Sequence, residues 1–562
     1  MFLSKRNFAK DEKGNALYVI SSEGGEARQI LKREEGIGSP KWAPDSKSVF
    51  FTSSVVRKEK DDVKVITRRT FWFNGLGFVH DRRTHLFSCD IATKKATQHT
   101  KGEIEVGDFA VSHDGKKVAY VVTSDDIRPY LADIFVLDVS SRRSRKLTKA
   151  PLEISSVAWS PDDSRICFAG STLPSGFASH RRIWTIPATG GKLTKAEDED
   201  RNKSNSLNSD ARAKDHGPGN VIWTKDGIYY PRADGGSVHL CLAKPGEPTE
   251  LVIGGERSVE GYAVNDGTLA FVAMDSRHLE ELYFKAGRGE KKLTELNAIT
   301  EKELEIIPPE RFTFKASDGE PIEGWLVVPA SKKKVPLILY VHGGPKTAFG
   351  NSYVHEFQAF AAAGYAVVFM NPRGSDGYSE KFADIRGRYG TRDYDDLMEG
   401  LDRVLKAHRE LDGTRVAIAG GSYGGFMTNW AIGHTDRFKA AVTDRCISSW
   451  TSFWGTSDIG PYFTRDQVGG DPWNSEEKLL ADSPLTYVQN VKTPLLIVHS
   501  MEDFRCWMVE GLEFFSALKE LGKEAELVLF PGESHDLSRT GKPKHRVVRL
   551  NHYLRWFGKH LK

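Results

Sequence analysis

The sequence has few cysteines, no long hydrophobic run and no strong excess of charge of either sign. Its five cysteines are odd in number and widely separated, without C-x-x-C spacing, so neither a disulfide framework nor a cysteine zinc site is expected. We therefore expect buried free thiols, and neither a metal nor another cofactor. No run approaches about 18 apolar residues, and the start lacks an apolar core of secretory length, which together predict a cytoplasmic location.

The near balance of 79 basic and 76 acidic residues gives a formal charge of +3. This balance provides no broad electrostatic attraction for nucleic acid or an anionic membrane, and neither is expected as a partner. Apolar residues make up 39% and charged residues 28%, as in soluble globular proteins. The composition does not fix the oligomeric state, so a homo-oligomer stays open.

The first half of the chain repeats one unit, which reads strand, turn, strand, then a W-x-P-D-type turn and another strand. One clear copy is DIFVLDVSSRRSRKLT followed by VAWSPDDSRICFAG. The aspartates of these turns are Asp45, Asp114, Asp162, Asp226 and Asp266. They are spaced by roughly 40 to 70 residues, which is expected for one propeller blade plus its loops. An isolated blade cannot bury both faces, which favours a β-propeller of about seven blades over an open solenoid. The first blade is expected to be incomplete, because no turn and strand precede FLSKR.

The second half alternates apolar strands with helix-like segments, and a linker around Pro308 precedes it. The strand VPLILYVHGG, the helix HEFQAFAAAG and the strand YAVVFMNPRG are typical of an α/β domain with a mostly parallel sheet. We predict a β-propeller domain over 1–305 and an α/β-hydrolase domain over 306–562.

Ser422 is the candidate nucleophile. It lies in RVAIAGGSYGGF, between a buried strand and a helix, and glycines on both sides leave room for a sharp strand-to-helix turn. The main-chain N–H of Tyr423 would then point toward a developing oxyanion at the helix N-terminus. The turn HGG after another strand would supply a second donor, which we assign to the N–H of Gly344.

A serine nucleophile needs a base and an orienting carboxylate, which follow in the order Ser, Asp, His in this fold. The strand TPLLIVHS leads to Asp503, and the strand AELVLF leads to a loop with His535. Both residues fall at the carboxyl ends of strands, where open α/β sheets carry their sites. Glu502 is the rival acid, because either residue of the pair could point inward.

These motifs, with the repeats before them, resemble the prolyl oligopeptidase family of serine peptidases, in particular its acylaminoacyl-peptidase branch. The motifs that carry the resemblance are HGGP at 342–345, NPRGSDGYS at 371–379, GGSYGG at 420–425, GTSDIG at 455–460, D-x-R at 503–505 and GESH at 532–535. The resemblance implies a hydrolase of short peptides whose propeller narrows access to a site between the domains. Tyr423 after the nucleophile favours dipeptidyl and acylaminoacyl peptidases, and no glutamate pair for a substrate ammonium is recognisable.

Several residues near the expected site are candidates for substrate contacts. Arg505 could hold a substrate carbonyl or form a structural ion pair. Aromatic residues that could line an apolar pocket, or serve as ordinary core, are Trp450, Phe453, Trp454, Tyr462 and Phe463. A basic cluster that could meet a peptide carboxylate, or lie in a solvated loop, consists of Arg68, Arg69, Arg82 and Arg83.

The interpretation favoured by these observations is a peptidase that releases N-acylated amino acids. A dipeptidyl peptidase, an oligopeptidase or a carboxypeptidase of the same family stays open. A carboxylesterase is a further alternative, because the same chemistry attacks esters. The alternative from another class of protein is a binding scaffold whose hydrolase domain is inactive. The presence of all three residues Ser422, Asp503 and His535 argues against this alternative.

Overall fold

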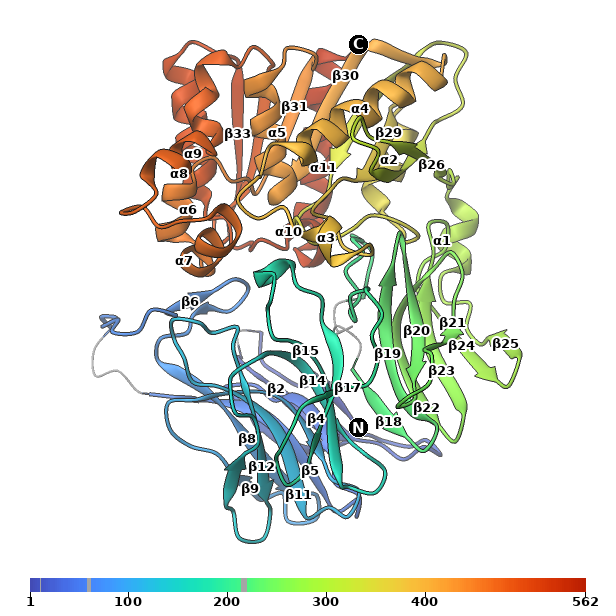
Figure 1. Cartoon of the computed structure of the whole chain (residues 1–562), viewed down its shortest axis with the longest axis vertical. Coiled ribbons are helices and arrows are strands. Elements are labelled where there is room, and N and C mark those ends of the chain that lie inside the picture. Colours follow the sequence, from blue (N-terminus) through green and yellow to red (C-terminus); the bar gives the residue numbers. More distant parts are fainter. Residues whose placement is uncertain (11, 58–61, 214–219, 562) are drawn as a thin grey trace.

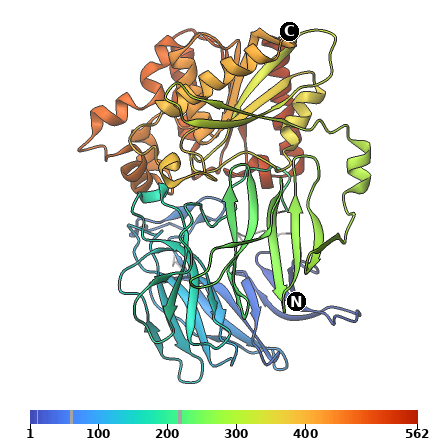
Figure 2. The same ribbon diagram turned by 45° about the vertical axis from the view of Figure 1, so that its right-hand side comes forward.

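The chain folds into a lower body of antiparallel sheets and an upper α/β body (Figure 1). The computed structural model describes residues 1–562 except 11, 58–61, 214–219 and 562. Figure 2 shows α1 (Ala298–Glu303) beside the two bodies, on the connection between them. None of the helices in the described residues is long and apolar enough to cross a membrane.

The lower body is a series of small antiparallel sheets that follow each other in the chain. A three-stranded sheet comes first, three four-stranded sheets follow, and an eight-stranded sheet ends the series. The eight-stranded sheet consists of two four-stranded halves, which a single parallel pair, Val238 with Ser258, joins. The strands of the first three sheets are β1 (Phe2–Ser4), β2 (Asn15–Val19), β3 (Arg28–Arg33); β4 (Gly38–Trp42), β5 (Ser48–Val56), β8 (Arg82–Asp90), β9 (Ala96–Gln98); β10 (Glu105–Val111), β11 (Lys117–Thr123), β12 (Asp133–Asp138) and β13 (Ser144–Lys146). Those of the remaining sheets are β14 (Glu153–Trp159), β15 (Arg165–Ser171), β16 (Arg182–Pro187), β17 (Thr194–Lys195); β18 (Ile222–Thr224), β19 (Gly227–Asp234), β20 (Ser237–Ala243), β21 (Glu250–Ile253); β22 (Ser258–Asn265), β23 (Thr268–Met274), β24 (Glu281–Ala286) and β25 (Gly289–Lys292).

Each sheet packs its apolar face on the next one, as expected for propeller blades. One apolar cluster joins the first sheet to the second through Leu17 and Phe51, and another joins the second to the third through Phe50 and Phe109. The first strands of successive sheets face a common cavity of about 480 Å³, lined by Trp42 and residues of β10, β14, β18 and β22. The stacking around this cavity buries the facing sides of successive blades.

The expectation of about seven blades is wrong for the described residues, which form six blade-like sheets. The segment LYFKAGRGEKK, which reads as half of a further repeat, forms the outer hairpin β24–β25 of the last sheet. Because each sequence repeat spans the end of one blade and the start of the next, the trailing half completes an existing blade. The first sheet has three strands, as the missing turn before FLSKR predicts.

The upper body is built on one eight-stranded sheet in the order β26-β27-β29-β28-β30-β31-β32-β33. Pairing is antiparallel from β26 to β29 and parallel from β29 to β33. The strands are β26 (Glu310–Lys315), β27 (Pro321–Val327), β28 (Val335–Val341), β29 (Ala366–Asn371), β30 (Leu411–Gly421), β31 (Ala440–Asp444), β32 (Leu495–Ser500) and β33 (Ala525–Phe530). The helices are α2 (His355–Ala362), α3 (Glu380–Ala383), α4 (Arg392–Ala407), α5 (Tyr423–His434), α6 (Trp450–Thr456), α7 (Gly460–Phe463), α8 (Glu476–Ala481), α9 (Met508–Glu520), α10 (Leu537–Thr540) and α11 (Pro543–His560).

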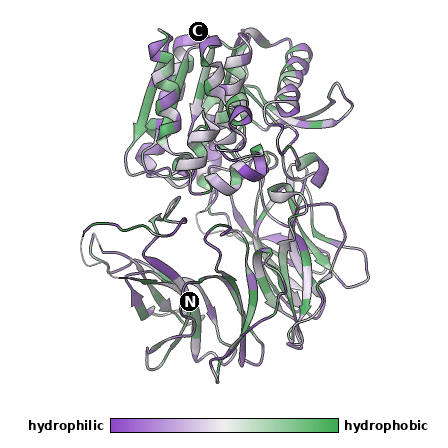
Figure 3. Cartoon of the chain, turned by 60° about the vertical axis from the view of Figure 1, so that its left-hand side comes forward, coloured by the Kyte–Doolittle hydropathy of each residue, from purple (hydrophilic) through white to green (hydrophobic). Residues whose placement is uncertain are grey.

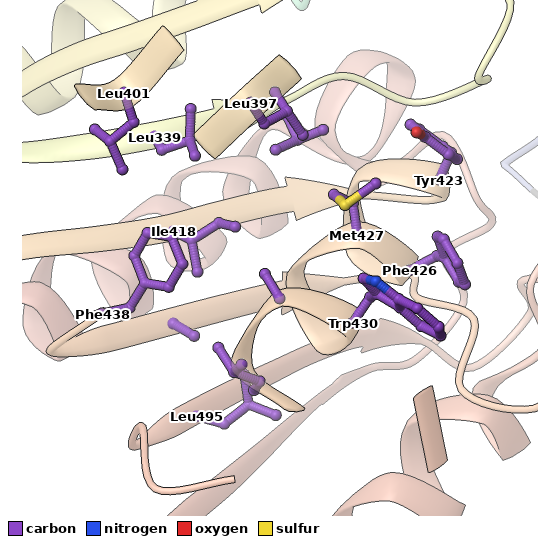
Figure 4. Close-up of a cluster of buried hydrophobic side chains, with 14 of the residues drawn as sticks. Leu339, Leu397, Leu401, Ile418, Tyr423, Phe426, Met427, Trp430, Phe438 and Leu495 are labelled. Carbon is purple, nitrogen blue, oxygen red and sulfur yellow. The ribbon is translucent and has the colours of Figure 1, made fainter. Parts of the chain in front are cut away.

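Alternating residues of the central strands pack into two separate hydrophobic cores, one on each face of the sheet. Leu339 of β28 packs with α4, α5 and α9 on one face of the sheet, whereas Ile338 packs with α2 and α11 on the other. Figure 4 shows part of the first core, where Leu339 and Ile418 lie near Met427 of α5. Figure 3 shows hydrophobic colour along strands of both bodies. Helices on both faces hold the sheet rigid and present its carboxyl edge toward the propeller.

All five cysteines are buried and free, as the sequence predicts. Burial raises the pKa of the Cys446 thiol to about 12, which keeps it protonated and unreactive near neutral pH.

Candidate active site

Ser422 lies in a strained turn between β30 and α5. Its φ of 63° and ψ of −122° place a non-glycine residue in a sparsely populated region, as in a nucleophile elbow. The main-chain N–H of Ser422 donates to the carbonyls of Asp444 and Arg445, at 3.0 and 3.1 Å. A Cβ at Gly424 would lie 2.2 Å from the carbonyl oxygen of Val341, so only glycine lets α5 approach β28 this closely.

Asp503 and His535 meet at the carboxyl ends of neighbouring strands β32 and β33. His535 Nδ1 lies 2.8 Å from Asp503 Oδ2, and the Asp503 side chain is completely buried. Asp503 Oδ1 accepts the main-chain N–H groups of Arg505 and Cys506, at 3.0 and 2.9 Å. Glu502 is exposed, so Asp503 is the residue of this acidic pair that contacts His535.

The structure does not join Ser422 to His535 directly. Among the hydrogen bonds of the described residues none links them, and Ser422 Oγ lies 4.0 Å from Cys506 Sγ. Cys506 is a site neighbour that sequence analysis missed, since its position three residues after Asp503 gives no signal by itself. Proton transfer requires Ser422 Oγ and His535 to come within hydrogen-bond distance, and catalytic hydrogen bonds often tighten only when substrate is bound.

The surroundings of the Asp503–His535 pair disfavour charge on both groups. Burial raises the pKa of Asp503 to about 7. Burial, reinforced by the nearby Arg445 and Arg539 guanidinium groups, holds the pKa of His535 well below its usual value. The Asp503–His535 pair therefore takes up one proton from solvent as the pH falls through the neutral range. Below that range the pair carries one proton more than in its active form.

We expect kcat/KM to rise with pH through an apparent pKa of about 7. The active form needs ionised Asp503 and a neutral His535, and one added proton on either group removes the base. A pH profile of kcat/KM with a short peptide substrate measures this value. Glu502→Gln serves as the control and should leave the profile unchanged, because that side chain is exposed. A flat profile from about pH 5 to 8 would contradict the prediction.

Several main-chain N–H groups near Ser422 have no hydrogen-bond acceptor within the part of the chain that the structure describes. They include the N–H groups of Tyr423, the first residue of α5, and of Gly343 and Gly344, in the turn after β28. A Cβ at the neighbouring Gly343 would lie 3.4 Å from Ser422 Cβ, so this turn borders the serine. An oxyanion formed at Ser422 would need donors of this kind.

Asp393 fixes the side chain of Tyr423, another feature that sequence analysis missed. The Tyr423 hydroxyl donates to Asp393 Oδ2 at 2.5 Å, and Asp393 also accepts the N–H groups of Gly390 and Thr391. Burial raises the pKa of Asp393 to about 6. The acidic start of α4 was the available signal, but nothing in the sequence linked it to Tyr423.

Two of the aromatic candidates are core residues, so the expectation that they line a substrate pocket is not met. Trp450 is 0% and Phe453 is 1% exposed, and the indole N–H of Trp450 donates to the carbonyl of Asp482. Phe463 packs partly buried against the same core. These rings contact α5 and its neighbours because burying an apolar ring releases the most free energy where water is fully excluded.

Of the other two aromatic candidates, Tyr462 lies at the domain interface. Tyr462 packs against Tyr130 and Phe177 of the propeller, with ring centroids 5.0 and 5.7 Å apart. The indole N–H of Trp454 donates to Asp471 at 3.0 Å. Tyr462 is thus the predicted aromatic residue with contacts to both domains.

Arg505 forms the ion pair that was one of its two expected roles. Its Nε and Nη2 atoms donate to the buried carboxylate of Asp458, at 2.7 and 3.1 Å. Its Nη1 atom makes no hydrogen bond among the described residues, and the side chain is 29% exposed. One face of the guanidinium therefore stays available to a ligand.

Three of the four arginines in the basic cluster of the propeller pair with acidic neighbours. Arg68 and Arg83 pair with Glu105 and Asp126, while Arg69 donates to the carbonyl of Ile127. Arg82 pairs with Asp81 at 3.3 Å. A cavity of about 360 Å³ lies among these charges, but the paired arginines leave no clear excess of positive charge for a peptide carboxylate.

No group of three or more His, Cys, Asp or Glu side chains in the described residues could hold a metal ion.

Comparisons with known proteins agree with both domains. Residues 351–562 match the prolyl oligopeptidase family, and residues 4–278 match the N-terminal β-propeller domain of acylaminoacyl-peptidase. The uncharacterized peptidase YuxL of Bacillus subtilis is 39% identical, over 99% of this chain and 88% of that protein. Dipeptidyl-peptidase 5 of Porphyromonas gingivalis is 28% identical, over 61% of this chain and 52% of its own length.

The fold is also that of solved structures. Acylaminoacyl peptidase of Pyrococcus horikoshii matches with a TM-score of 0.87 and 28% identity, over 98% of this chain and 86% of that one. The predicted combination of a β-propeller and an α/β-hydrolase domain is confirmed.

Proposed function

Because the chain belongs to the prolyl oligopeptidase family of serine peptidases, we propose that it hydrolyses short peptides through Ser422, His535 and Asp503 and releases N-acylated amino acids. The observation that carries the triad is the 2.8 Å contact between His535 Nδ1 and buried Asp503, next to the serine elbow. This contact holds the proton on Nδ1 and leaves Nε2 as the base.

In the proposed reaction, Ser422 Oγ attacks the carbonyl carbon of the scissile bond while its proton moves to His535 Nε2. The N–H groups of Tyr423 and Gly344 stabilise the oxyanion, and Asp503 stabilises the imidazolium. The tetrahedral intermediate collapses, and the leaving amine takes the proton from Nε2. Water then attacks the acyl-enzyme by the same route and regenerates Ser422.

The charges around the site favour a substrate whose amino terminus is blocked and uncharged. The carboxylates on the propeller side of His535 already have cationic partners, since Asp458 pairs with Arg505 and Asp536 pairs with Arg539. A substrate ammonium would be desolvated beside these neutral pairs without a carboxylate of its own, which costs free energy. An N-acyl group avoids this cost and adds apolar contact. The free Nη1 of Arg505 is suited to a substrate carbonyl oxygen.

We expect acetylated peptides to be cleaved at least about tenfold better, by kcat/KM, than the same peptides with free amino termini. An apolar residue such as Phe or Leu should be favoured before the scissile bond. Matched pairs of acetylated and free chromogenic peptides test this preference. Above about pH 8 the free amine loses its charge, so the difference should narrow, which is an internal control.

Other outcomes distinguish the alternatives. Better cleavage of the free peptides would overturn the acyl preference and favour a dipeptidyl peptidase, as the relative from Porphyromonas gingivalis is named. Turnover of simple esters without any peptide cleavage would favour a carboxylesterase. No reaction of Ser422 with a fluorophosphonate probe would favour the inactive scaffold.

A further inference from the structure

A hairpin of the propeller reaches the loops that carry Asp503 and His535. It consists of β6 (Trp72–Phe73) and β7 (Gly77–Phe78), and it is inserted between β5 and β8. Figure 1 shows β6 on the side of the propeller that faces α6 and α7. This hairpin contacts the candidate base through its turn residue Asn74.

Aromatic packing fixes the hairpin on the upper domain. Trp72 is 8% exposed and stacks on Phe504, with ring centroids 5.0 Å apart. The same indole meets the ring of Trp507 edge to face, at 4.6 Å. Phe504 and Trp507 flank Arg505 and Cys506, in the loop that follows Asp503. Aromatic pairs of this kind contribute beyond their buried area and restrict relative motion.

The turn residue Asn74 forms hydrogen bonds with the loop of His535 and with Asp458. Its Oδ1 accepts the main-chain N–H of His535 at 3.0 Å, and its Nδ2 donates to Asp536 Oδ2 at 3.0 Å. Its own main-chain N–H donates to Asp458 Oδ2 at 2.9 Å, and Asp458 is the partner of Arg505. Asn74 thus contacts the loop of the base directly and reaches the loop of the acid only through Asp458 and its partner Arg505.

We propose that Asn74 is a positioning residue that holds the main chain of His535, so that its imidazole stays aligned between Asp503 and Ser422. The proposal rests on the proposed role of His535 as the base. Asn74 touches no reacting atom and acts through the backbone of residues 535 and 536. A base that must transfer protons over hydrogen-bond distances loses rate when its loop shifts by about an ångström.

Only an amide meets the demands of this position. The same side chain must accept from an N–H and donate to a carboxylate, which asparagine does with its two terminal atoms. Aspartate would keep the acceptor for His535 but would direct a second carboxylate at Asp536. Asn74→Asp therefore replaces a hydrogen bond by charge repulsion without a change of size.

The test compares Asn74→Ala and Asn74→Asp with a matched control, Asn351→Ala. Asn351 Nδ2 donates to Ser237 Oγ at 2.9 Å, which is also a contact between the domains, but far from the loop of His535 in the chain. The readouts are kcat and KM with an acetylated peptide, the rate of Ser422 labelling by a fluorophosphonate, and the melting temperature.

Asn74→Ala is expected to lower kcat and the labelling rate about 10- to 100-fold, while KM and the melting temperature stay nearly unchanged. Asn74→Asp is expected to lower kcat and the labelling rate further. Asn351→Ala should behave as the wild type. Wild-type labelling and kcat in both Asn74 variants would overturn the proposal, as would an equal loss in the control. An unreactive Ser422 in the wild type would instead overturn the triad itself, and with it the role of Asn74.

Discussion

Ser422→Ala is expected to lower kcat by about 10⁴- to 10⁶-fold, and His535→Ala by a similar factor. The double variant should be no slower than either single one, because the nucleophile and its base act as one unit. Turnover of an acetylated peptide, measured with enough enzyme to detect the residual rate, gives all three values.

Folding should survive these changes, because neither side chain is part of an apolar core. Ser331→Ala is the matched control, since Ser331 is an exposed serine of the same domain and should tolerate the change with full activity. If Ser422→Ala kept a turnover near that of the wild type, Ser422 would not be the nucleophile. A similar result for His535→Ala would remove the histidine from the mechanism.

Asp503→Asn is expected to lower kcat by about 10⁴-fold while the fold is kept. The amide oxygen can still accept the N–H groups of Arg505 and Cys506, as Asp503 Oδ1 does. The amide NH₂ then faces His535 Nδ1, so that Nδ1 must accept a hydrogen bond and the ring proton moves to Nε2. In this tautomer Nε2 cannot accept the proton of Ser422.

The neighbouring substitution Glu502→Gln is the matched control for this prediction. Glu502 is exposed and lies next to Asp503 in the chain, so the change removes one carboxylate charge nearby without touching His535. Activity within about twofold of the wild type is expected for Glu502→Gln. The assignment of the acid would be wrong if Glu502→Gln, and not Asp503→Asn, abolished turnover.

The candidate nucleophile and its partners could be predicted because their signals are local. An apolar strand followed by a glycine-flanked serine and a helix needs a sharp turn, and the structure has that turn at Ser422. Parallel strands end at the same edge of a sheet, so residues after β32 and β33 had to lie close together. The Asp503–His535 contact follows from this rule.

Burial of single side chains could not be predicted in the same way. The segment from Trp450 to Phe463 is aromatic whether it lines a pocket or a core, and its composition does not distinguish the two. Packing against α5 placed Trp450 and Phe453 inside. Arg505 likewise required the position of Asp458, which lies 47 residues earlier in the chain.

The sequence by itself determined the propeller, the α/β-hydrolase domain and the elbow, because periodicity, turn residues and chain order act over short distances. Tertiary structure decided how many blades the repeats form, which acid faces His535 and which aromatic rings are buried. It also decided the contact between Asn74 and His535, which are 461 positions apart. The physical reason is that each of these outcomes depends on contacts between residues far apart in the chain, within one domain or between the two, and no local pattern encodes that geometry.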